Sequence, residues 1–269
     1  ADALMLRSQK LHDETISNDV IAVARAGAGV NNIPVIDYAK RGIVVFNTPG
    51  ANANAVKELV AGALLLGSRD IFGGMSYVQT LGDISDSAQM HKLLEANKKR
   101  FAGSEISGMT LGVVGLGAIG ALVANMALEL GMKVAGFDPA ISIDAAWRLS
   151  SRVQKVDSLQ ALVGISDFVT LHVPAIPATM GLINADVLSK LKPGARLLNF
   201  ARDEIVDLPA VISALDSGKL AAYISDFPHP ELLGRKDAIL LPHIGASTLE
   251  AEENCAIMAA DQLMDFLEN

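Results

Sequence analysis

The sequence predicts an α/β protein built from two doubly wound, parallel-sheet lobes. The first observation is that short apolar runs alternate with stretches of helical periodicity along most of the chain. The second is the stretch 111–139, in which a strand, a glycine turn, a helix and a second strand follow one another closely. The third is size and composition, because 269 residues with 51% hydrophobic side chains can bury a large core and form two domains.

The predicted strands are apolar runs that end in turn or polar residues. They cover residues 3–6, 20–24, 43–46, 111–114, 134–137, 168–172, 196–199, 221–224 and 238–241. Helical periodicity predicts helices at residues 13–18, 34–42, 53–68, 76–101, 121–130, 144–149, 158–163, 209–217 and 249–267. The second of these begins at Pro34 and ends at Gly42, since proline suits a first helical turn and glycine a helix end. Strands separated regularly by helices indicate parallel sheets.

The stretch 111–139 has the parts needed to bind a dinucleotide. Gly115 permits the tight turn after the strand, Gly117 lets backbone approach a pyrophosphate, and Gly120 allows close helix packing. The N-terminus of the helix that follows this turn offers free N–H groups and a positive dipole end to phosphates. Asp138 ends the second strand and is placed to accept hydrogen bonds from ribose hydroxyls, while its charge repels a 2′-phosphate. The cofactor predicted is therefore NAD, and the alternative is a turn that binds nothing.

Charge and cysteine content narrow the classes of partner. A net charge of −8 argues against binding to nucleic acid or to an anionic membrane, although local donors can still bind a small anion. The sequence has no apolar run of transmembrane length and no signal peptide. The single cysteine, Cys255, cannot form an internal disulfide, so we expect a cytoplasmic protein. No cluster has the spacing of metal ligands.

The first lobe contains a polar cluster and a glycine loop. Arg7, Ser8 and Lys10 follow the first strand, at the end where open α/β sheets bind ligands. A solvated turn is the other interpretation of this cluster. The small residues of the loop 25–30 would expose backbone N–H groups to a carboxylate or a phosphate.

Polar side chains follow three strands of the second lobe. Together with a nicotinamide, they could support the oxidation of a 2-hydroxy acid. Arg202 is a fixed cation that can hold a carboxylate, and His243 can take or give the hydroxyl proton while a hydride moves to or from a nicotinamide. Asp226 and Glu231 follow the predicted strand 221–224, and a nearby carboxylate would stabilise the imidazolium. The alternatives are a structural histidine and a surface arginine, and His229 is a rival proton donor.

Several motifs together resemble the D-isomer-specific 2-hydroxy acid dehydrogenases over nearly the whole chain, and most of all their phosphoglycerate dehydrogenase branch. The matching pieces are GLGAIG with Asp138, LHVP with Thr179 and residues 181–183, the run 192–194, NFAR, the spacing from Asp226 to Glu231, and PHIGAST. The resemblance implies an NAD-binding Rossmann domain at residues 54–244. That domain would be inserted into a flavodoxin-like substrate domain, residues 1–53 and 245–269, whose first strand–helix unit is missing. We therefore expect a shortened or processed chain.

The resemblance also assigns site residues. Arg202 would anchor the substrate carboxylate and keto oxygen, His243 would be the acid/base and Glu231 its partner. The cofactor would be bound by Gly115, Gly117, Ala118, Ile119, Gly120, Asp138, His172, Val173, Pro174, Ala201, Asp226 and Gly245. The substrate would be bound by Arg7, Ser8, Lys10, Gly27, Ala28, Gly29 and Asn52, the polar ones holding a phosphate. The implied reaction is the NAD-dependent oxidation of 3-phosphoglycerate, the first step of serine synthesis.

Two local departures from the family pattern keep alternatives open. Asp203 follows Arg202 where the family has glycine, and Leu232 follows Glu231 where it has proline. The alternatives are a glyoxylate or hydroxypyruvate reductase, another D-2-hydroxy acid dehydrogenase, and a non-catalytic NAD(H)-sensing protein. The family also implies a homodimer formed through the nucleotide-binding domain, with the segment 70–108 as the contact arm.

Overall fold

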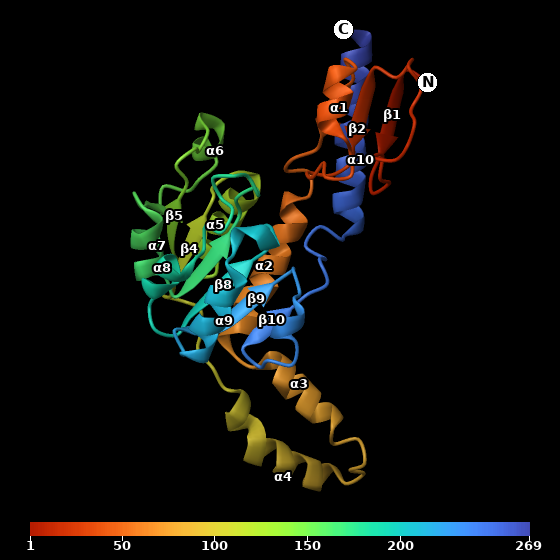
Figure 1. The fold of residues 1–269 in the computed structure, drawn as a ribbon. Coiled ribbons are helices and arrows are strands. Elements are labelled where there is room, and N and C mark those ends of the chain that lie inside the picture. The colour runs from red at the N-terminus through yellow and green to blue at the C-terminus, as the bar shows by residue number, and fades with distance from the viewer. The chain divides into compact units, whose positions relative to one another are not determined.

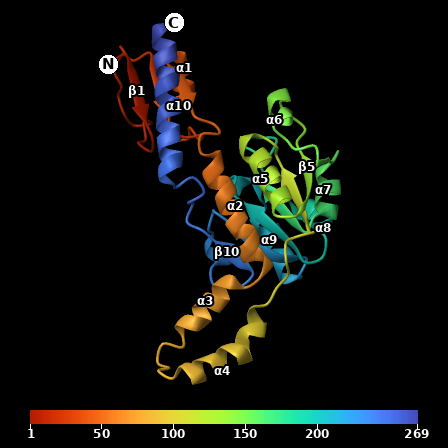
Figure 2. The same ribbon diagram turned by 180° about the vertical axis from the view of Figure 1, so that it is seen from behind.

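The computed structural model describes residues 1–269 and divides them into two compact units. Unit 1 comprises residues 1–57 and 244–269, and unit 2 comprises residues 58–243, so unit 2 interrupts unit 1 in the sequence. Figures 1 and 2 show the elements of each unit. The strands are parallel in both, which confirms the predicted α/β class. None of the helices is both long and apolar enough to cross a membrane.

Unit 1 has a three-stranded sheet with a helix on each side. The strands are β1 (Ala3–Leu6), β2 (Ala22–Arg25) and β3 (Val44–Asn47), in that order, with Val23 opposite both Leu4 and Val45. Side chains alternate between the two faces of a strand. Val23 belongs to a cluster that includes Tyr38 of α1 (Val35–Lys40), whereas Ala24 belongs to one that includes Cys255 and Ala259 of α10 (Leu249–Glu268). The helix α10, from the far end of the chain, thus covers the sheet of the N-terminal segment.

Unit 2 has a seven-stranded parallel sheet in the order β10-β9-β8-β7-β4-β5-β6. Its strands are β4 (Thr110–Val114), β5 (Lys133–Phe137), β6 (Gln154–Lys155), β7 (Phe168–Leu171), β8 (Ala195–Asn199), β9 (Leu220–Ser225) and β10 (Ala238–Leu240). The order reverses beside β4, and open α/β sheets bind ligands at such a point, outside the carboxyl ends of the strands. The glycine turn follows β4 and therefore lies at this point.

Helices connect these strands and bury them. They are α2 (Ala53–Ser68), which spans the limit between the units, α3 (Ile71–Gln79), α4 (Ser87–Asn97), α5 (Ala118–Glu129), α6 (Ile143–Trp147), α7 (Leu159–Ile165), α8 (Ala185–Ser189) and α9 (Leu208–Asp216), with single 3₁₀ turns η1 (Lys98–Phe101), η2 (Asp203–Ile205) and η3 (Pro230–Leu232). All four residues of β7 are buried, as expected for an inner strand with both faces covered. The main core cluster joins Leu171 and Leu197 of the sheet to Leu162 and Val211 of the helices.

Two predicted helices differ in the structure. Residues 13–18 form no helix and are irregular between turns at 12–13 and 18–19. The Ser17 hydroxyl donates to the Asp19 carboxylate at 3.0 Å and accepts the Asp19 N–H at 3.2 Å, which competes with helical bonding. The region 76–101 is not one helix but parts of α3 and α4 followed by η1. Asp86 starts α4 as its N-cap by accepting the N–H groups of Ala88 and Gln89. Strand β6, helix α8 and the turns η2 and η3 are too short to give a periodic signal in the sequence.

Candidate active site

The glycine turn after β4 is built as the three glycines require. Gly115 has φ +88°, and a Cβ at this residue would lie 2.6 Å from the His172 carbonyl oxygen. A Cβ on Gly120 would lie 1.9 Å from the carbonyl oxygen of Gly115, so the helix packs against its own entry turn. Gly117 is the N-cap of α5, and a Cβ there would meet no atom within 4 Å. The space beside Gly117 is therefore open to a ligand at the positive end of the helix.

Asp138 is joined to this turn by a hydrogen bond. Its Oδ2 accepts the Leu116 N–H at 2.8 Å, and its Oδ1 accepts the Ala140 N–H at 2.9 Å. The N–H of Gly115 bonds to the Phe137 carbonyl at 2.9 Å, which fixes the end of β5 beside the turn. Each carboxylate oxygen can accept more than one hydrogen bond, so Asp138 retains acceptor capacity for ribose hydroxyls.

A hollow of about 230 Å³ lies beside the open glycine. Its lining comes from the start of α5 and from α6 with its capping residues: Gly117, Ala118, Ala121, Ser142, Asp144, Ala145 and Arg148. Open space beside Gly117, free helix N–H groups and a carboxylate at the end of β5 are the features that a dinucleotide needs. The residues present therefore fit NAD, the group expected from the sequence.

His172, Val173 and Pro174 follow β7, and His172 and Val173 lie against Gly115 of the glycine turn. The His172 N–H donates to the Val114 carbonyl at 2.8 Å, and its ring Nε2 lies 2.9 Å from the Thr170 hydroxyl. Nδ1 is buried without a partner. Burial lowers the pKa of His172 to about 3, so the ring is neutral near pH 7. A neutral, buried ring of this kind fits a structural role in supporting the glycine turn.

The turn that carries Arg202 is held by a residue that the sequence did not single out as functional. Asn199, the last residue of β8, is fully buried; its Nδ2 donates to the Arg202 carbonyl at 2.8 Å and its Oδ1 accepts the Ala201 N–H at 3.2 Å. Arg202 Nη1 donates to the Ala201 carbonyl at 2.6 Å, and Asp203 is exposed at the start of η2. An asparagine at the end of an apolar run, three residues before an arginine, is the sequence signal that could have identified this support.

Asp226 and His243 lie at the ends of β9 and β10, which are neighbours in the sheet. Asp226 is 2% exposed, and its N–H donates to the Asn199 carbonyl at 3.1 Å, next to the Arg202 turn. His243 is exposed and has φ +56°, a left-handed conformation that is uncommon outside glycine. Its ring lies 5.0 Å from that of Phe227, centroid to centroid. The structure therefore places His243 beside the loop that begins at Asp226.

Glu231 is placed next to His229. The Glu231 N–H donates to His229 Nδ1 at 3.4 Å, and the carboxylate lies 3.8 Å from the same nitrogen. The Glu231 carboxylate lies beside His229 in this structure, because His229 caps η3, the single turn that contains Glu231. The pairing of Glu231 with His243 stays a prediction.

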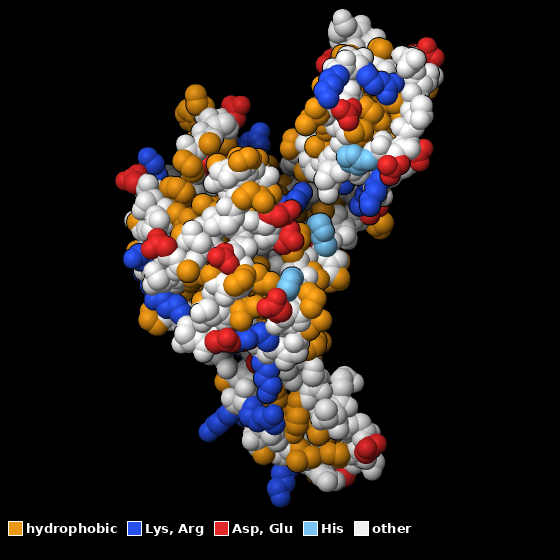
Figure 3. All heavy atoms as spheres, in the orientation of Figure 1, with side chains coloured by type: hydrophobic (Ala, Val, Ile, Leu, Met, Phe, Trp, Pro, Cys, Tyr) orange, Lys and Arg blue, Asp and Glu red, His pale blue; other side chains and the backbone are white.

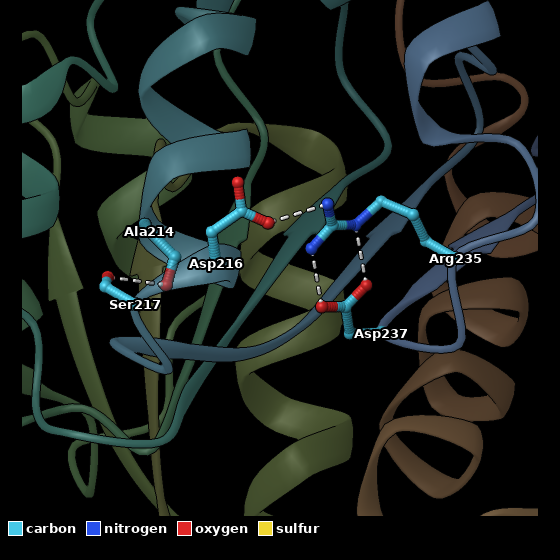
Figure 4. Close-up of polar contacts among 5 residues, drawn as sticks. All are labelled: Ala214, Asp216, Ser217, Arg235 and Asp237. Carbon is cyan, nitrogen blue, oxygen red and sulfur yellow. Dashed lines mark hydrogen bonds and ion pairs between the residues drawn. The ribbon is translucent and has the colours of Figure 1, made fainter.

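An ion-pair network secures the segment between Glu231 and His243. The Arg235 guanidinium binds Asp237 through two hydrogen bonds of 2.8 Å and Asp216 of α9 through a third of 2.8 Å (Figure 4). The Arg235 guanidinium lowers the pKa of Asp237, and the carboxylates of Asp237 and Asp216 raise the pKa of Arg235. Because Asp237 immediately precedes β10, this network fixes the start of the strand that ends near His243.

The predicted substrate residues of unit 1 lie at the carboxyl ends of its strands. Arg7 Nη1 is 2.6 Å from Glu252 Oε2, and Ser8 and Lys10 are exposed. Asn52 is partly buried, and its Oδ1 has no hydrogen-bond partner. In the glycine loop, Gly27 has φ +152°, the Ala28 carbonyl accepts a hydrogen bond from Asn47 Nδ2 at 2.6 Å, and Gly29 is partly buried. The predicted cofactor residue Gly245 is buried and precedes α10. Arg7, one of the two cations expected to hold a phosphate, is thus already paired with a carboxylate.

Comparison with known proteins identifies the family. Residues 75–245 match the model of the D-isomer specific 2-hydroxyacid dehydrogenase, NAD binding domain. The chain belongs to this family. It is similar to the D-3-phosphoglycerate dehydrogenase of Synechocystis sp., with 36% identity over 99% of this chain and 47% of that protein. It is similar to that of Methanocaldococcus jannaschii, with 35% identity over 99% of this chain and 50% of that protein.

A solved structure agrees with these relatives. The NAD⁺-bound 3-phosphoglycerate dehydrogenase of Entamoeba histolytica has 28% identity and a TM-score of 0.76, covering all of this chain and 80% of that one. The chain spans about half the length of the curated relatives it matches. The resemblance stated from the sequence motifs is confirmed, and the NAD-binding domain of the family includes the glycine turn and Asp138.

Proposed function

We propose that the protein is an NAD-dependent oxidoreductase that interconverts 3-phosphoglycerate and 3-phosphohydroxypyruvate, as in the first step of L-serine synthesis. The observation that carries the proposal is the glycine turn with its open Gly117 and the adjoining Asp138, in a chain whose relatives are D-3-phosphoglycerate dehydrogenases. The Asp138 carboxylate favours NAD over NADP, because it would repel a 2′-phosphate.

The second unit would supply the chemistry. NAD, when bound, accepts the hydride from C2 of the hydroxy acid. Arg202 would hold the substrate carboxylate and the oxygen at C2, and His243 would accept the hydroxyl proton at its ring nitrogen as the keto group forms. Glu231 would stabilise the resulting imidazolium, which requires its carboxylate to leave His229 Nδ1, now 3.8 Å away. All of these residues lie within 54–244, the range that we propose as the NAD-binding domain.

The cofactor would be bound mostly by backbone and small side chains. Gly115, Gly117, Ala118, Ile119 and Gly120 would accommodate the pyrophosphate at the start of α5. The remaining residues proposed to line the cofactor are His172, Val173, Pro174, Ala201, Asp226 and Gly245. Of these, Asp226 supports the proposal best, since its backbone is bonded to Asn199, which also holds the turn of Arg202.

Residues 1–53 and 245–269 would form the substrate-binding domain. The N–H groups of Gly27, Ala28 and Gly29 would receive the substrate carboxylate. Arg7, with Ser8, Lys10 and Asn52, would receive the phosphate. Arg7 would then exchange Glu252 for the phosphate, and the unpartnered Asn52 Oδ1 is an acceptor available to a ligand hydroxyl.

The Arg7–Glu252 ion pair favours one alternative. If it persists with substrate bound, unit 1 offers a phosphate little net positive charge from Arg7, and an unphosphorylated 2-keto acid fits better. The enzyme would then be a glyoxylate or hydroxypyruvate reductase, with the same roles for Arg202 and His243.

We further propose a homodimer formed through the arm of α3 and α4. The side chains of Phe72, Met75 and Val78 are 71%, 64% and 46% exposed, and neither helix buries any of its own residues. Figure 3 shows hydrophobic side chains gathered along this pair of helices, at the lower end of the view. A second copy of the arm is the partner that the family implies.

We also propose a cytoplasmic location. Cys255 is the single cysteine, which supports a reducing, cytoplasmic setting.

A substrate panel tests the function. NADH oxidation is followed with phosphohydroxypyruvate, hydroxypyruvate, glyoxylate and 2-oxoglutarate, each with the wild type and with Arg7→Ala. We expect the highest kcat/KM with phosphohydroxypyruvate and a KM for it that rises steeply in Arg7→Ala. A preference for glyoxylate or hydroxypyruvate, with a KM indifferent to Arg7, would establish the alternative instead.

A further inference from the structure

We propose that Arg148, on the segment after α6, is a cofactor-binding residue that supplies positive charge to the pyrophosphate of NAD. The glycine turn itself carries no cation, because residues 115–121 are all glycine or aliphatic. The glycine turn can then attract the pyrophosphate, with its two negative charges, only through backbone N–H groups and the helix dipole. A cation contributed by another segment would complete this part of the site.

The hollow beside Gly117 shows which segment contributes it. Gly117 and Ala118, at the start of the helix where the pyrophosphate would lie, line the same hollow as Arg148. Arg148 is the one cation in that lining, and a single carboxylate, Asp144, accompanies it. The absence of a side chain on Gly117 leaves space between the two walls.

The backbone of Arg148 is anchored to the helix that the pyrophosphate would contact. Asn125 of α5 donates from Nδ2 to the Arg148 carbonyl at 3.0 Å and accepts the Ser150 N–H on Oδ1 at 3.1 Å. Arg148 forms its hydrogen bonds through its backbone, whereas the Arg152 guanidinium pairs with Glu129 at 2.5 Å. One amide side chain therefore fixes the position of Arg148, and its guanidinium is available to a ligand.

The position in the hollow favours the pyrophosphate over a 2′-phosphate. Asp138, the residue that would face the ribose hydroxyls, is not among the lining residues, whereas the N-cap Gly117 and the first residue of α5, Ala118, are. An arginine at this place would act on every ligand that contains the pyrophosphate, with or without a 2′-phosphate. This prediction depends on NAD binding and not on which hydroxy acid is the substrate.

Binding measurements test the proposal without reference to turnover. The Kd values of NADH, NADPH, ADP-ribose and adenosine are measured by calorimetry or fluorescence for the wild type, Arg148→Ala, Arg148→Lys and the control Arg152→Ala. We expect Arg148→Ala to weaken NADH and ADP-ribose by about tenfold, the effect of one charge-assisted hydrogen bond, with adenosine unchanged. Arg148→Lys should recover part of the loss, and Arg152→Ala should bind like the wild type.

The same ligands give the contrary outcomes. A loss confined to NADPH would mean that Arg148 contacts a 2′-phosphate, and equal losses for adenosine and ADP-ribose would mean that the substitution only disturbs the fold of the hollow. Equal affinities of Arg148→Ala and Arg152→Ala for NADH would also overturn the proposal. If instead the wild type binds NADH normally but reduces no keto acid, the proposed enzymatic function fails and the role of Arg148 stands.

Discussion

Asp138 Oδ2 accepts the backbone N–H of Leu116 at 2.8 Å, so the carboxylate that would select the cofactor also braces the glycine turn. The two roles depend on different properties of the side chain. The brace needs one acceptor oxygen, whereas repulsion of a 2′-phosphate needs the negative charge. Substitutions at Asp138 can therefore separate cofactor choice from the integrity of the turn.

Asp138→Asn should relax the preference for NADH over NADPH while the turn stays intact. The amide keeps an acceptor for the Leu116 N–H but loses the charge. Asp138→Ala should relax the preference and weaken both cofactors, because the N–H of Leu116 loses its partner. Kd values for NADH and NADPH with each variant measure this. A ratio of the two that stays at the wild-type value in Asp138→Asn would contradict the assignment.

Asn199→Ala should lower kcat/KM by about tenfold or more through a misplaced Arg202, since displacement of a positioning group has large kinetic effects. Loss of the buried amide also leaves the Arg202 carbonyl and the Ala201 N–H without partners, at a cost of about 1–3 kcal/mol in the free energy of unfolding. Asn184→Ala is the matched control, because Asn184 caps α8 by accepting the Val187 N–H at 3.1 Å. It should lose stability and keep its kinetics. Equal kinetic losses in both variants would show that Asn199 acts only on stability.

Glu252→Gln should lower the KM for phosphohydroxypyruvate by a few fold, because Arg7 no longer has to leave a carboxylate. The pair is about half exposed, so an exposed ion pair worth ~0.2–1 kcal/mol sets the size of the effect. Glu253→Gln, at an exposed position one residue on, is the control. Steady-state kinetics at low salt measure the difference. A KM that rises or is unchanged in Glu252→Gln would exclude Arg7 as the phosphate ligand.

His172 should make stability depend on pH below neutrality. The folded protein leaves this ring unprotonated until about pH 3, whereas the unfolded chain protonates near 6.5. The free energy of unfolding therefore rises with pH between those values, by at most ~1.4 kcal/mol per unit, and this contribution is complete above 6.5. Urea unfolding at about pH 5 and pH 7 should show a loss in the wild type that is about 2 kcal/mol smaller in His172→Gln. The exposed His12→Gln should behave like the wild type, and identical losses in all three proteins would refute this role.

The parts of the fold that the sequence predicts are those with local signals. The strand–turn–helix from β4 to α5 is predictable because Gly115 and Gly120 are the residues that its close contacts allow. The prediction of a helix at 13–18 was wrong because polar side chains there bond to one another and to the backbone, which hydrophobic periodicity does not reveal. Long-range pairing was equally invisible: no pattern in the sequence indicates that Arg7 meets Glu252, or that Asn199 holds the Arg202 turn. Residue types at a site are thus predictable, and their partners require the folded chain.

The most direct test of the account is the rate of hydride transfer in His243→Ala, measured as single-turnover oxidation of NADH with phosphohydroxypyruvate. Removal of a general acid/base costs about 10²–10⁴-fold, so we predict a loss in that range with NADH affinity retained. His229→Ala, which removes the rival imidazole beside Glu231, should keep a rate close to that of the wild type. A wild-type rate in His243→Ala, or the large loss in His229→Ala instead, would contradict the central claim.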